Sequence, residues 1–431
     1  MKMRGDGRSR LPSFAGGMSG FCVRRGFPRR ERVRAIKEFP GNPAALHKAA
    51  RPWLRPAANL YARIMQTRRR LYASGALSAY SPSIPAVSVG NIALGGSGKT
   101  PLVSFLLTWA EKRGKRAVVL IRGYGGRPGA APLAVRADTP PSICGDEGLM
   151  LARAHPEATV LAHPRRALAA ELAERFLRPD LLILDDGMQH LSMGRSVDIV
   201  LLRPQDLDED YDLVLPAGPW REGAKALRQA DVFAVKLGAD PLSGRALERL
   251  AALGRPVYPF RLRAVALRPL QEGTGGMPGR LTRDSCPAQD GKDAGREDAV
   301  GKDACRDGAG GEGAGRLYLL ASGVGDPAGV ENTAETFMGR RPERHFIFAD
   351  HHRFTARGLR GMLTDAPSGL PLLCTAKDAV KLEAFASVFA GRKVFVLETA
   401  LVFEPPLFTD TGFCAWWEKT FARLEADLRA C

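Results

Sequence analysis

A glycine-rich segment at residues 87–101 has the residue types and spacing needed to bind phosphate groups. It reads Val-Ser-Val-Gly-Asn-Ile-Ala-Leu-Gly-Gly-Ser-Gly-Lys-Thr-Pro, an apolar run followed by a turn and a helical pattern. Such a turn points backbone N–H groups inward, and the helix N-terminus adds partial positive charge. Lys99 would reach the terminal phosphates and Thr100 would ligate Mg²⁺. The segment therefore predicts nucleotide binding by Gly95, Gly96, Ser97, Gly98, Lys99 and Thr100.

One position departs from the usual phosphate-loop pattern G-x-x-x-x-G-K-[ST]. That pattern places a glycine five residues before Gly98, where this chain has Ala93. The extra Gly95 and Gly96 can supply the missing backbone freedom. A chance Gly-Lys-Thr without a phosphate role is the competing interpretation, and the strand–turn–helix context argues against it.

Two adjacent carboxylates, Asp185 and Asp186, end the apolar run at 181–184. In P-loop proteins a strand beside the phosphate loop commonly ends in an aspartate that supports Mg²⁺. Two carboxylates at one strand end repel each other unless a cation is present. We therefore predict a metal role for this pair, against the alternative of a capped turn after a buried strand.

Two distant segments carry candidates for acid–base chemistry. Asp146 opens a helical segment, where it is either a helix cap or a carboxylate that activates a hydroxyl near the γ-phosphate. His351 and His352 follow Asp350, but adjacent side chains on extended backbone point apart, which disfavours metal binding by both. One imidazole oriented by a carboxylate is the better functional interpretation.

Two further segments have more than one interpretation. Residues 215–222 form a proline-rich loop that ends in Arg221 and Glu222, either a functional pair or a surface turn. Residues 375–378 read Thr-Ala-Lys-Asp, a near miss for the guanine signature [NT]-K-x-D in which the lysine comes one place late. The guanine interpretation is therefore weak.

The basic charge of the chain is concentrated at its N-terminus. Of the net charge of +17 over 431 residues, the first 72 residues carry +15. The rest is nearly neutral, so we expect no nucleic-acid partner, and we infer no obligate protein partner. No apolar run reaches 18 residues, no secretory signal is recognisable, and the seven cysteines are scattered without metal-binding spacing. These features indicate a cytosolic protein with reduced thiols.

The N-terminal region divides into two predicted segments. Residues 1–40, rich in Arg, Gly and Pro, are expected to be a disordered basic extension. Within 41–80 we predict a helix over 44–73, broken by Pro52 and Pro56, with aromatic and arginine residues and, up to residue 72, no acidic residue. Such a helix suits an anionic membrane surface, and the alternative is a helix packed on its own domain with a solvated basic face.

Alternating apolar and helical patterns predict an α/β fold with two domains. Residues 81–240 are expected to form a doubly wound, mostly parallel sheet with strands at 85–90, 116–121, 158–162, 181–185, 197–202 and 231–236. Residues 241–431 are expected to form a smaller α/β domain with strands near 255–264, 317–321, 344–348, 371–375 and 393–397. Within it we expect a disordered insertion at 271–315 and a terminal helix at 411–429.

Taken together, these segments resemble the tetraacyldisaccharide 4′-kinases, P-loop kinases of lipid A assembly. The resemblance covers residues from about 50 to 425 apart from 271–315. It rests on eight ordered blocks: V-G-N-I-x-x-G-G-S-G-K-T-P, R-G-Y-G-G, G-D-E, L-D-D-G-M-Q-H, L-P-A-G-P-W-R-E, A-S-G-V-G-D-P, F-A-D-H-H and T-A-K-D-A-V-K. The family's own phosphate loop lacks the glycine that Ala93 replaces.

The resemblance implies transfer of the ATP γ-phosphate to the 4′-hydroxyl of tetraacyldisaccharide 1-phosphate, an acylated glucosamine disaccharide, giving lipid IVA. It implies ATP, Mg²⁺ and a peripheral position at the cytoplasmic face of the bacterial inner membrane. It assigns Asp146 as the general base, paired with His351 in preference to His352, and Lys99 to the phosphates. It further implies phosphate contact by Arg165 or Arg166, a nucleotide contact by Arg221, and metal support by Thr100, Asp185, Asp186 and Glu222.

This chain departs from the family pattern at two positions. Gly148 stands where proline is frequent, which puts the rigidity of the Asp146 loop in doubt, and Lys236 stands where a small polar residue is usual. The competing function is a membrane-associated P-loop ATPase or GTPase switch that recruits partners. A switch hydrolyses nucleotide slowly without an acceptor, whereas a kinase turns over little until its acceptor is added.

Overall fold

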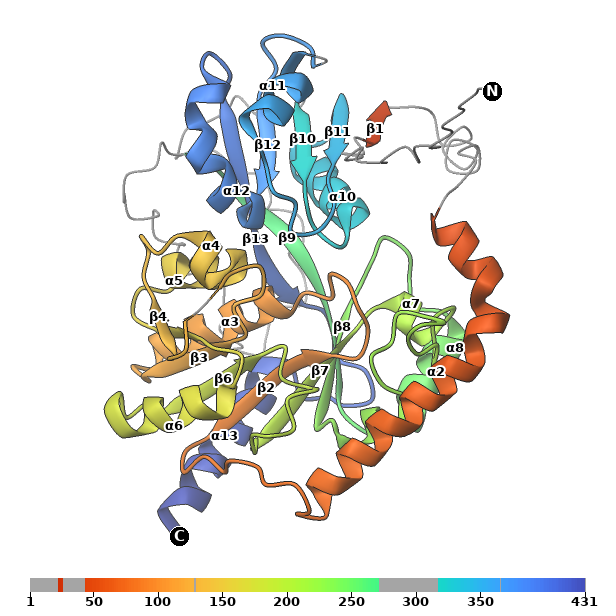
Figure 1. Cartoon of the computed structure of the whole chain (residues 1–431), viewed down its shortest axis with the longest axis vertical. Coiled ribbons are helices and arrows are strands. Elements are labelled where there is room, and N and C mark those ends of the chain that lie inside the picture. Colours follow the sequence, from red (N-terminus) through yellow and green to blue (C-terminus); the bar gives the residue numbers. More distant parts are fainter. Residues whose placement is uncertain (1–21, 26–42, 128, 271–316, 365, 431) are drawn as a thin grey trace, which may run out of the picture.

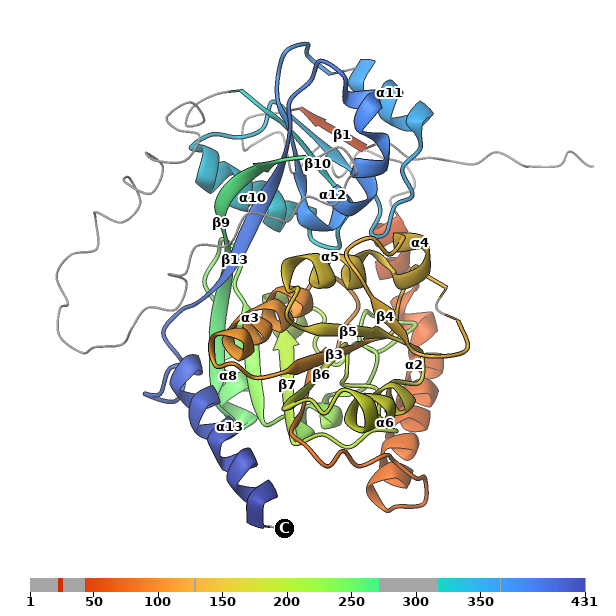
Figure 2. The ribbon, with the colours of Figure 1, turned by 90° about the vertical axis from the view of Figure 1, so that its left-hand side faces the viewer.

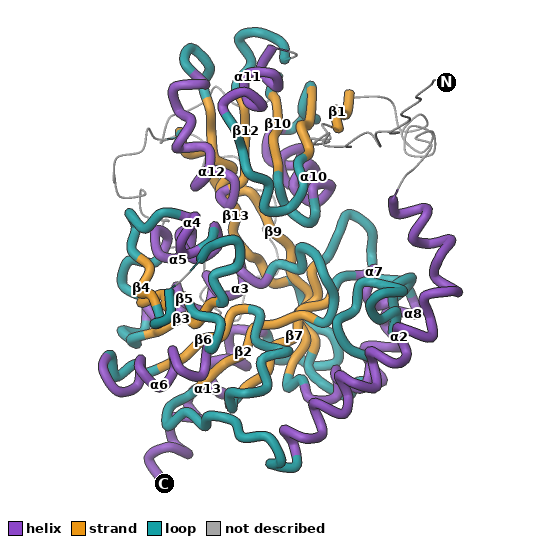
Figure 3. The backbone as a smooth tube through the Cα atoms, viewed as in Figure 1, coloured by secondary structure: helices purple, strands orange, loops and turns teal. Residues whose placement is uncertain are grey.

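A computed structural model describes residues 22–25, 43–127, 129–270, 317–364 and 366–430. Most of the predicted insertion and N-terminal extension therefore lies outside the described residues. Helices and strands alternate in two layered lobes, and strands from both lobes join in one sheet (Figures 1 and 3). Its strand order is β1-β11-β10-β12-β13-β9-β8-β7-β2-β6-β3-β5-β4.

The lower lobe in Figure 1 is a parallel sheet built from strands whose side chains are nearly all buried. Runs rich in Val, Ile and Leu form such strands because helices cover both faces of the sheet. The confirmed strands are β2 (Ala86–Asn91), β3 (Ala117–Ile121), β5 (Thr159–Ala162), β6 (Leu181–Asp185), β7 (Val197–Leu202) and β8 (Val232–Lys236).

The lower lobe's principal helices are α3 (Lys99–Lys112), α5 (Asp146–Ala154), α6 (Arg166–Phe176) and α8 (Gly244–Ala252). The short elements are β4 (Leu133–Val135), which adds an antiparallel edge strand, α4 (Pro141–Cys144), α7 (Pro204–Leu207) and η1 (Ala224–Gln229). Of these, η1 is a 3₁₀-helix. The predicted mostly parallel α/β architecture is confirmed here.

Two long strands, β9 (Val257–Pro269) and β13 (Val394–Phe403), connect the lobes. They pair antiparallel from Phe260–Phe403 to Pro269–Phe395, and the remaining start of β9 pairs with β8. Both strands run beyond the ranges expected from sequence, because each continues as half-exposed ribbon past the buried part of its own lobe. The second set of strands thus continues the first sheet through this ribbon.

The upper lobe contains β10 (Leu319–Ser322), β11 (Arg344–Ile347) and β12 (Leu372–Thr375), all parallel to one another. Around them lie α10 (Pro327–Met338), α11 (Ala356–Thr364), α12 (Ala376–Leu382) and η2 (Glu383–Phe389). A kink at Phe385 interrupts η2, which follows α12 directly. Because β9 runs parallel to β8 but antiparallel to β13, the upper strands run opposite to the lower ones.

One part of the expected disordered extension is structured. Cys22–Arg25 form β1, which pairs antiparallel with β11 at the edge of the sheet. The prediction was wrong for these four residues, because an open strand edge offers backbone hydrogen bonds whatever the charge of the incoming segment. The rest of residues 1–40 lies outside the described residues.

The N-terminal helix α2 (Pro43–Ala73) runs along the outside of the lower lobe (Figure 1). The expected break at Pro52 and Pro56 is absent, since both prolines are exposed and the carbonyls left unpaired can bond to water. Ala58 is buried, and Tyr61 and Ala62 pack against a core cluster. Among the described helices, none combines the length and apolarity needed to cross a bilayer.

The C-terminal helix α13 (Phe413–Ala430) returns from the ribbon to the lower lobe (Figure 2). Its aromatic side chains pack on α3. The ring centroid of Trp417 lies 5.3 Å from that of Trp109, and Phe421 lies 4.9 Å from the same Trp109 ring. The last helix of the chain therefore stabilises the helix that begins at the phosphate loop.

We predict that Trp417→Ala lowers the free energy of unfolding by about 3–5 kcal/mol, because Trp417 is fully buried between α13 and α3. Urea unfolding followed by far-UV circular dichroism measures the change. Leu428→Ala, on the exposed side of the same helix, is the control and should stay within about 0.5 kcal/mol of the wild type. Equal loss in both variants would contradict the packing role.

Candidate functional site

The phosphate loop lies between the end of β2 and the start of α3. Gly98 caps α3 with φ 90° and ψ 23°, and Gly95 has φ 116°, so both positions need glycine. Ala93 is absent from the residues with positive φ, is fully buried, and pairs with Trp220 in an isolated bridge. Alanine in place of the glycine of the usual pattern therefore causes no backbone strain at position 93.

Lys99 reaches from the loop toward the carboxylates after β6. Its Nζ donates to Asn91 Oδ1 at 3.1 Å and lies 3.7 Å from Asp186 Oδ1. Arg221 approaches the same carboxylate, with NH1 at 2.8 and 2.7 Å from the two oxygens of Asp186. The structure thus brings the predicted Lys99, Asp186 and Arg221 together.

The two carboxylates after β6 have opposite electrostatic environments. Burial and the nearby charge of Glu147 raise the pKa of Asp185 to about 7, and its Oδ1 has no hydrogen-bond partner among the described residues. Burial would also raise the pKa of Asp186, but Lys99 and Arg221 outweigh it and hold that pKa below its usual value. A buried carboxylate without a partner, beside an ionised one, suits a cation.

Arginine 166 supports this turn from α6, whereas the neighbouring Arg165 is exposed. Arg166 NH1 donates to the backbone carbonyl of Asp186 at 2.9 Å and also to that of Asp185. Burial lowers its pKa to about 10. Between the two arginines proposed for phosphate contact, Arg166 therefore holds the turn that carries the carboxylates.

Asp146 and His351, which were predicted to pair, are in contact between the two lobes. Asp146, at the start of α5, places Oδ2 3.4 Å from Nδ1 of His351 and 3.3 Å from Nζ of Lys381. Burial would raise the pKa of Asp146, but the hydrogen bond with His351 and the charge of Lys381 hold it below its usual value. His352 turns instead toward the rings of Phe348 and Phe354.

Backbone strain and close packing fix this pair. His351 has φ 57°, a left-handed conformation rare outside glycine, and its ring lies 4.9 Å from that of Tyr124. Gly145 has φ 82°, and a Cβ there would lie 2.3 Å from the carbonyl oxygen of Tyr124. A Cβ on Gly148 would lie 2.5 Å from Ile121, so that glycine lets α5 pack closely on β3.

Glu222 does not join the other predicted metal ligands. It is buried, and Arg69 of α2 binds both of its oxygens, at 2.9 Å from Nε and 2.8 Å from NH2. Arg221 therefore faces Asp186, whereas Glu222 faces away from it. The run Arg68–Arg70 carried no signal that its middle residue is buried.

The sequence also did not predict a contact between the phosphate loop and the upper lobe. Lys236, at the end of β8, donates to Asp326 Oδ2 at 2.7 Å and to the carbonyl of Gly96 at 3.3 Å. A Cβ on Gly325 would lie 2.7 Å from the backbone nitrogen of Gly96. The residue that departs from the family pattern therefore links the loop to the start of α10.

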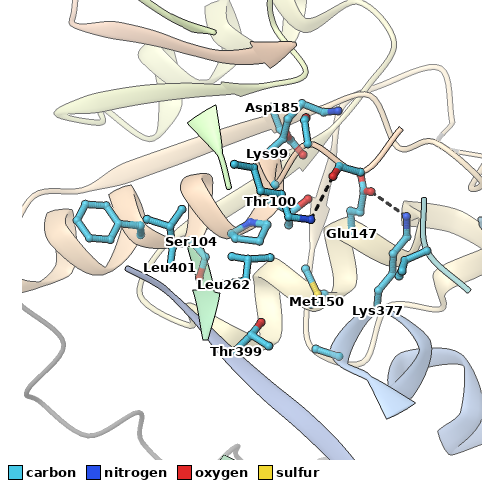
Figure 4. Close-up of a pocket in the computed structure, with 18 of the residues that line it drawn as sticks. Lys99, Thr100, Ser104, Glu147, Met150, Asp185, Leu262, Lys377, Thr399 and Leu401 are labelled. Carbon is cyan, nitrogen blue, oxygen red and sulfur yellow. Dashed lines mark hydrogen bonds and ion pairs between the residues drawn. The ribbon is translucent and has the colours of Figure 1, made fainter. Parts of the chain in front are cut away.

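One pocket is lined by many of these groups, though not by Asp146, with walls from both lobes and from the β9–β13 ribbon. Lys99, Thr100, Asp185, Glu147 and Lys377 lie around it, together with apolar side chains of the ribbon (Figure 4). Among the described residues, no group of three or more His, Cys, Asp or Glu side chains could hold a metal. A cation here would need phosphate oxygens or water as further ligands.

A glycine-rich loop at a helix start, a lysine beside it and an aspartate pair after the neighbouring strand together define a P-loop enzyme. The family model for tetraacyldisaccharide-1-P 4′-kinase matches residues 50–411, so the chain belongs to that family. It is 41% identical to the tetraacyldisaccharide 4′-kinase of Nitratidesulfovibrio vulgaris over 384 residues, which cover 88% of this chain and 97% of that protein.

Two more relatives agree. The tetraacyldisaccharide 4′-kinase of Pseudomonas paraeruginosa is 35% identical over 338 residues, covering 78% of this chain and 85% of that protein. The crystal structure of the "apo" form of LpxK from Aquifex aeolicus in complex with ATP superposes with a TM-score of 0.59 at 25% identity. It covers 87% of this chain and 99% of that one. The resemblance found in the sequence is confirmed.

We predict that Asp185→Asn makes the protein more stable above pH 7. Because the folded-state pKa of Asp185 is raised to about 7, folding favours its protonated form and stability falls as pH rises from about 4 to 7. An uncharged amide removes that loss. Thermal unfolding without added metal should show a gain that is larger at pH 8 than at pH 5, roughly 2–4 °C per kcal/mol.

The matched control is Asp240→Asn, at an exposed carboxylate in the loop after β8, for which no pH-dependent change is expected. A stability difference between Asp185→Asn and the wild type that is equal at both pH values would contradict the prediction.

Proposed function

We propose that this chain, a tetraacyldisaccharide 4′-kinase of lipid A biosynthesis by its family, transfers the ATP γ-phosphate to the 4′-hydroxyl of tetraacyldisaccharide 1-phosphate. The observation that carries the proposal is the convergence of two groups in one pocket. Lys99 and the aspartate pair line it from the lower lobe, and His351 lines it from the upper lobe, in contact with Asp146. Phosphoryl transfer requires positioning and charge neutralisation, and these groups supply both.

In this proposal the phosphate loop binds ATP. Backbone N–H groups of Gly95, Gly96, Ser97 and Gly98 would surround the phosphates, and Lys99 would exchange Asn91 and Asp186 for phosphate oxygens. Arg221 would make the same exchange from its side of Asp186. Both cations already lie within reach of the carboxylate that balances them.

Mg²⁺ fits the donor set beside this loop. Thr100, Asp185 and Asp186 would hold it, and the unpartnered Oδ1 of Asp185 with its raised pKa is the observation that supports the fit. When bound, the ion would neutralise charge on the phosphate oxygens. Glu222 is left out of the set because Arg69 binds both of its oxygens.

Asp146 would act as the general base. His351 and Lys381 both contact Oδ2, so Oδ1 is the oxygen that would take the proton from the 4′-hydroxyl. The lowered pKa of Asp146 keeps it ionised at neutral pH, as a base requires. His351 would hold the carboxylate in place through its Nδ1.

The acylated acceptor places the reaction at a membrane, and α2 has a surface suited to it. Trp53, Leu60, Ile64 and Leu71 are exposed, with side chains 86%, 61%, 55% and 41% accessible. Their spacing of seven, four and seven residues puts them on one line along the helix. Arginines of α2 would face anionic headgroups beside this stripe. We infer peripheral binding at the cytoplasmic face of the bacterial inner membrane.

The opposite face of α2 packs on the protein. In this proposal one face of the helix therefore packs on its own domain, and the other faces the membrane.

The competing function, a nucleotide-dependent switch, finds less support. Its guanine signature depends on Thr375 and Asp378, but Thr375 caps α12 and buried Asp378 accepts from the backbone of Gly323. These contacts make that segment part of a helix start.

We predict that Lys99→Ala and Asp146→Asn each lower phosphate transfer by at least about 10²-fold, because each removes a group needed in the transition state. The assay mixes purified protein, γ-labelled ATP and tetraacyldisaccharide 1-phosphate in detergent. Lys99→Ala should also weaken ATP binding, whereas Asp146→Asn should not. Slow ATP hydrolysis that the acceptor does not change, with no phosphate transferred to the acceptor, would favour the switch over the kinase.

We predict that the triple substitution Trp53→Ser, Leu60→Ser and Ile64→Ser weakens binding to phosphatidylglycerol vesicles at least tenfold, because it removes the apolar stripe. The kinase should keep its activity on detergent-dispersed acceptor, since these side chains point away from the protein. Leu77→Ser, an exposed apolar residue beyond α2, is the control. Unchanged vesicle sedimentation of the triple variant would rule out docking through this stripe.

A further inference from the structure

Helix α12 brings two lysines to the acid–base pair from the upper lobe. Lys377 and Lys381 are four residues apart, and so lie on one face of the helix. Their side chains are only 14% and 11% exposed. Two nearly buried ammonium groups at one site need opposite charges close by. The groups that they contact include both Asp146 and His351.

Lys381 faces the carboxylate. Its Nζ lies 3.3 Å from Oδ2 of Asp146 and 3.4 Å from Oδ1 of Asp378. The geometry of neither contact is that of a hydrogen bond, and Nζ makes none with the described residues. Its other neighbour is the ring of Phe354, 5.4 Å away. The main effect of Lys381 on Asp146 is therefore its charge.

Lys377 faces the imidazole. Its Nζ lies 3.2 Å from Nε2 of His351, 2.9 Å from Asp350 Oδ1 and 3.1 Å from Glu147 Oε1. An ammonium group only donates hydrogen bonds, so Nε2 must accept. The ring proton then sits on Nδ1, which points at Asp146 Oδ2. A protonated Nε2 would face the ammonium charge, so the contact also favours neutral imidazole.

We propose that Lys381 and Lys377 are positioning residues for the transfer reaction: Lys381 keeps Asp146 ionised, and Lys377 fixes His351 as the neutral Nδ1–H tautomer that holds it. The proposal rests on the general-base role proposed above for Asp146. Neither lysine touches the reacting atoms in this scheme. Each acts through the member of the pair that it contacts.

The charges packed around the pair explain why both lysines are needed. Carboxylates approach from every side: Glu147 on α5, Asp350 in the loop after β11 and Asp378 on α12. Tyr124 contacts His351 from the loop after β3, and His352 lies next to it in the chain. Without the lysines, the negative charges would favour protonation of both Asp146 and His351.

Helix α12 itself is held rigidly at its start. The buried Asp378 accepts from the backbone N–H of Gly323 at 2.8 Å and from Thr375 Oγ1 at 2.7 Å.

Lys377 also keeps its charge. Burial would lower the pKa of Lys377, but the carboxylates Glu147 and Asp350 raise it above its usual value. Lys377 therefore stays charged at any pH at which the enzyme works.

The first test is the pH dependence of kcat/KM for Lys381→Met, which keeps the length of the side chain and removes its charge. Loss of an opposite charge at this distance should move the acidic limb of the profile upward by about 1–3 pH units. Relative to the wild type, transfer should fall most at the acidic end of the profile, at pH 5, and recover toward pH 8. Lys381→Arg, which keeps the charge, should restore the wild-type profile.

Lys115→Met is the matched control, because Lys115 pairs with Glu425 of α13 away from the pocket. It should leave the profile unchanged. A loss in Lys381→Met that is the same at every pH, and not restored by arginine, would show a merely structural role and overturn the assignment. Circular dichroism confirms that each variant is folded.

The second test reads the tautomer directly and does not depend on activity. Nitrogen-15 NMR of labelled imidazoles, with His351 assigned by its loss in His351→Gln, should show the Nδ1–H form in the wild type at pH 7. Lys377→Met should show the Nε2–H form or imidazolium, and an unchanged spectrum would overturn the role of Lys377. Full activity in Asp146→Asn would instead reject the base role, and this spectrum would still decide the tautomer.

Discussion

The antiparallel pairing of β9 with β13 is the interaction on which the rest of the site depends. Because β9 leaves the lower lobe parallel to β8 and β13 enters beside β12, the pairing reverses the direction of the upper strands. Along β9, the lower lobe pairs up to Phe260, and the part of the ribbon level with β12 begins at Leu267, seven residues on and about 23 Å away at the rise of a strand. The carboxyl ends of both parallel sets therefore face one another across the pocket. Loops at carboxyl ends carry the functional groups of α/β folds.

This arrangement divides the work between the lobes. The lower lobe supplies the phosphate loop and the aspartate pair, which follow β2 and β6. The upper lobe supplies His351 and the two lysines of α12, and Asp146 on α5 meets them at the boundary. Positive charge from one lobe thus balances carboxylates from the other. Either lobe alone would hold an incomplete set.

Much of this could be predicted from the sequence, because local patterns determine it. Buried strands such as β6 are continuous apolar runs, and the glycines of the phosphate loop have the positive φ that their spacing implied. The pairing of Asp146 with His351, 205 residues apart, followed from the family resemblance alone. The periodicity of apolar residues along the chain does not show which distant residues come into contact.

What the sequence could not predict depends on contacts between distant residues. Arg69 lies in a run of three arginines, and only the packing of α2 buries one of them on Glu222. His155, fully buried between Ser104 and Glu111, had no local signal either. The extension of β9 and β13 and the pairing of β1 depend on partners far along the chain. Composition alone suggested disorder for β1.

The dipeptide Arg221–Glu222 has a consequence for how the enzyme could be redesigned. Its two side chains point in opposite directions, one to Asp186 at the nucleotide site and one to Arg69 inside α2. The contact of α2 with Glu222 and the contact of Arg221 with Asp186 are therefore joined by a single peptide bond. Helix α2 cannot be exchanged freely, because replacing it would leave a buried carboxylate unpaired next to the residue that holds Asp186. A replacement for the N-terminal part of α2 would have to end before Arg69 and preserve the buried face of the helix.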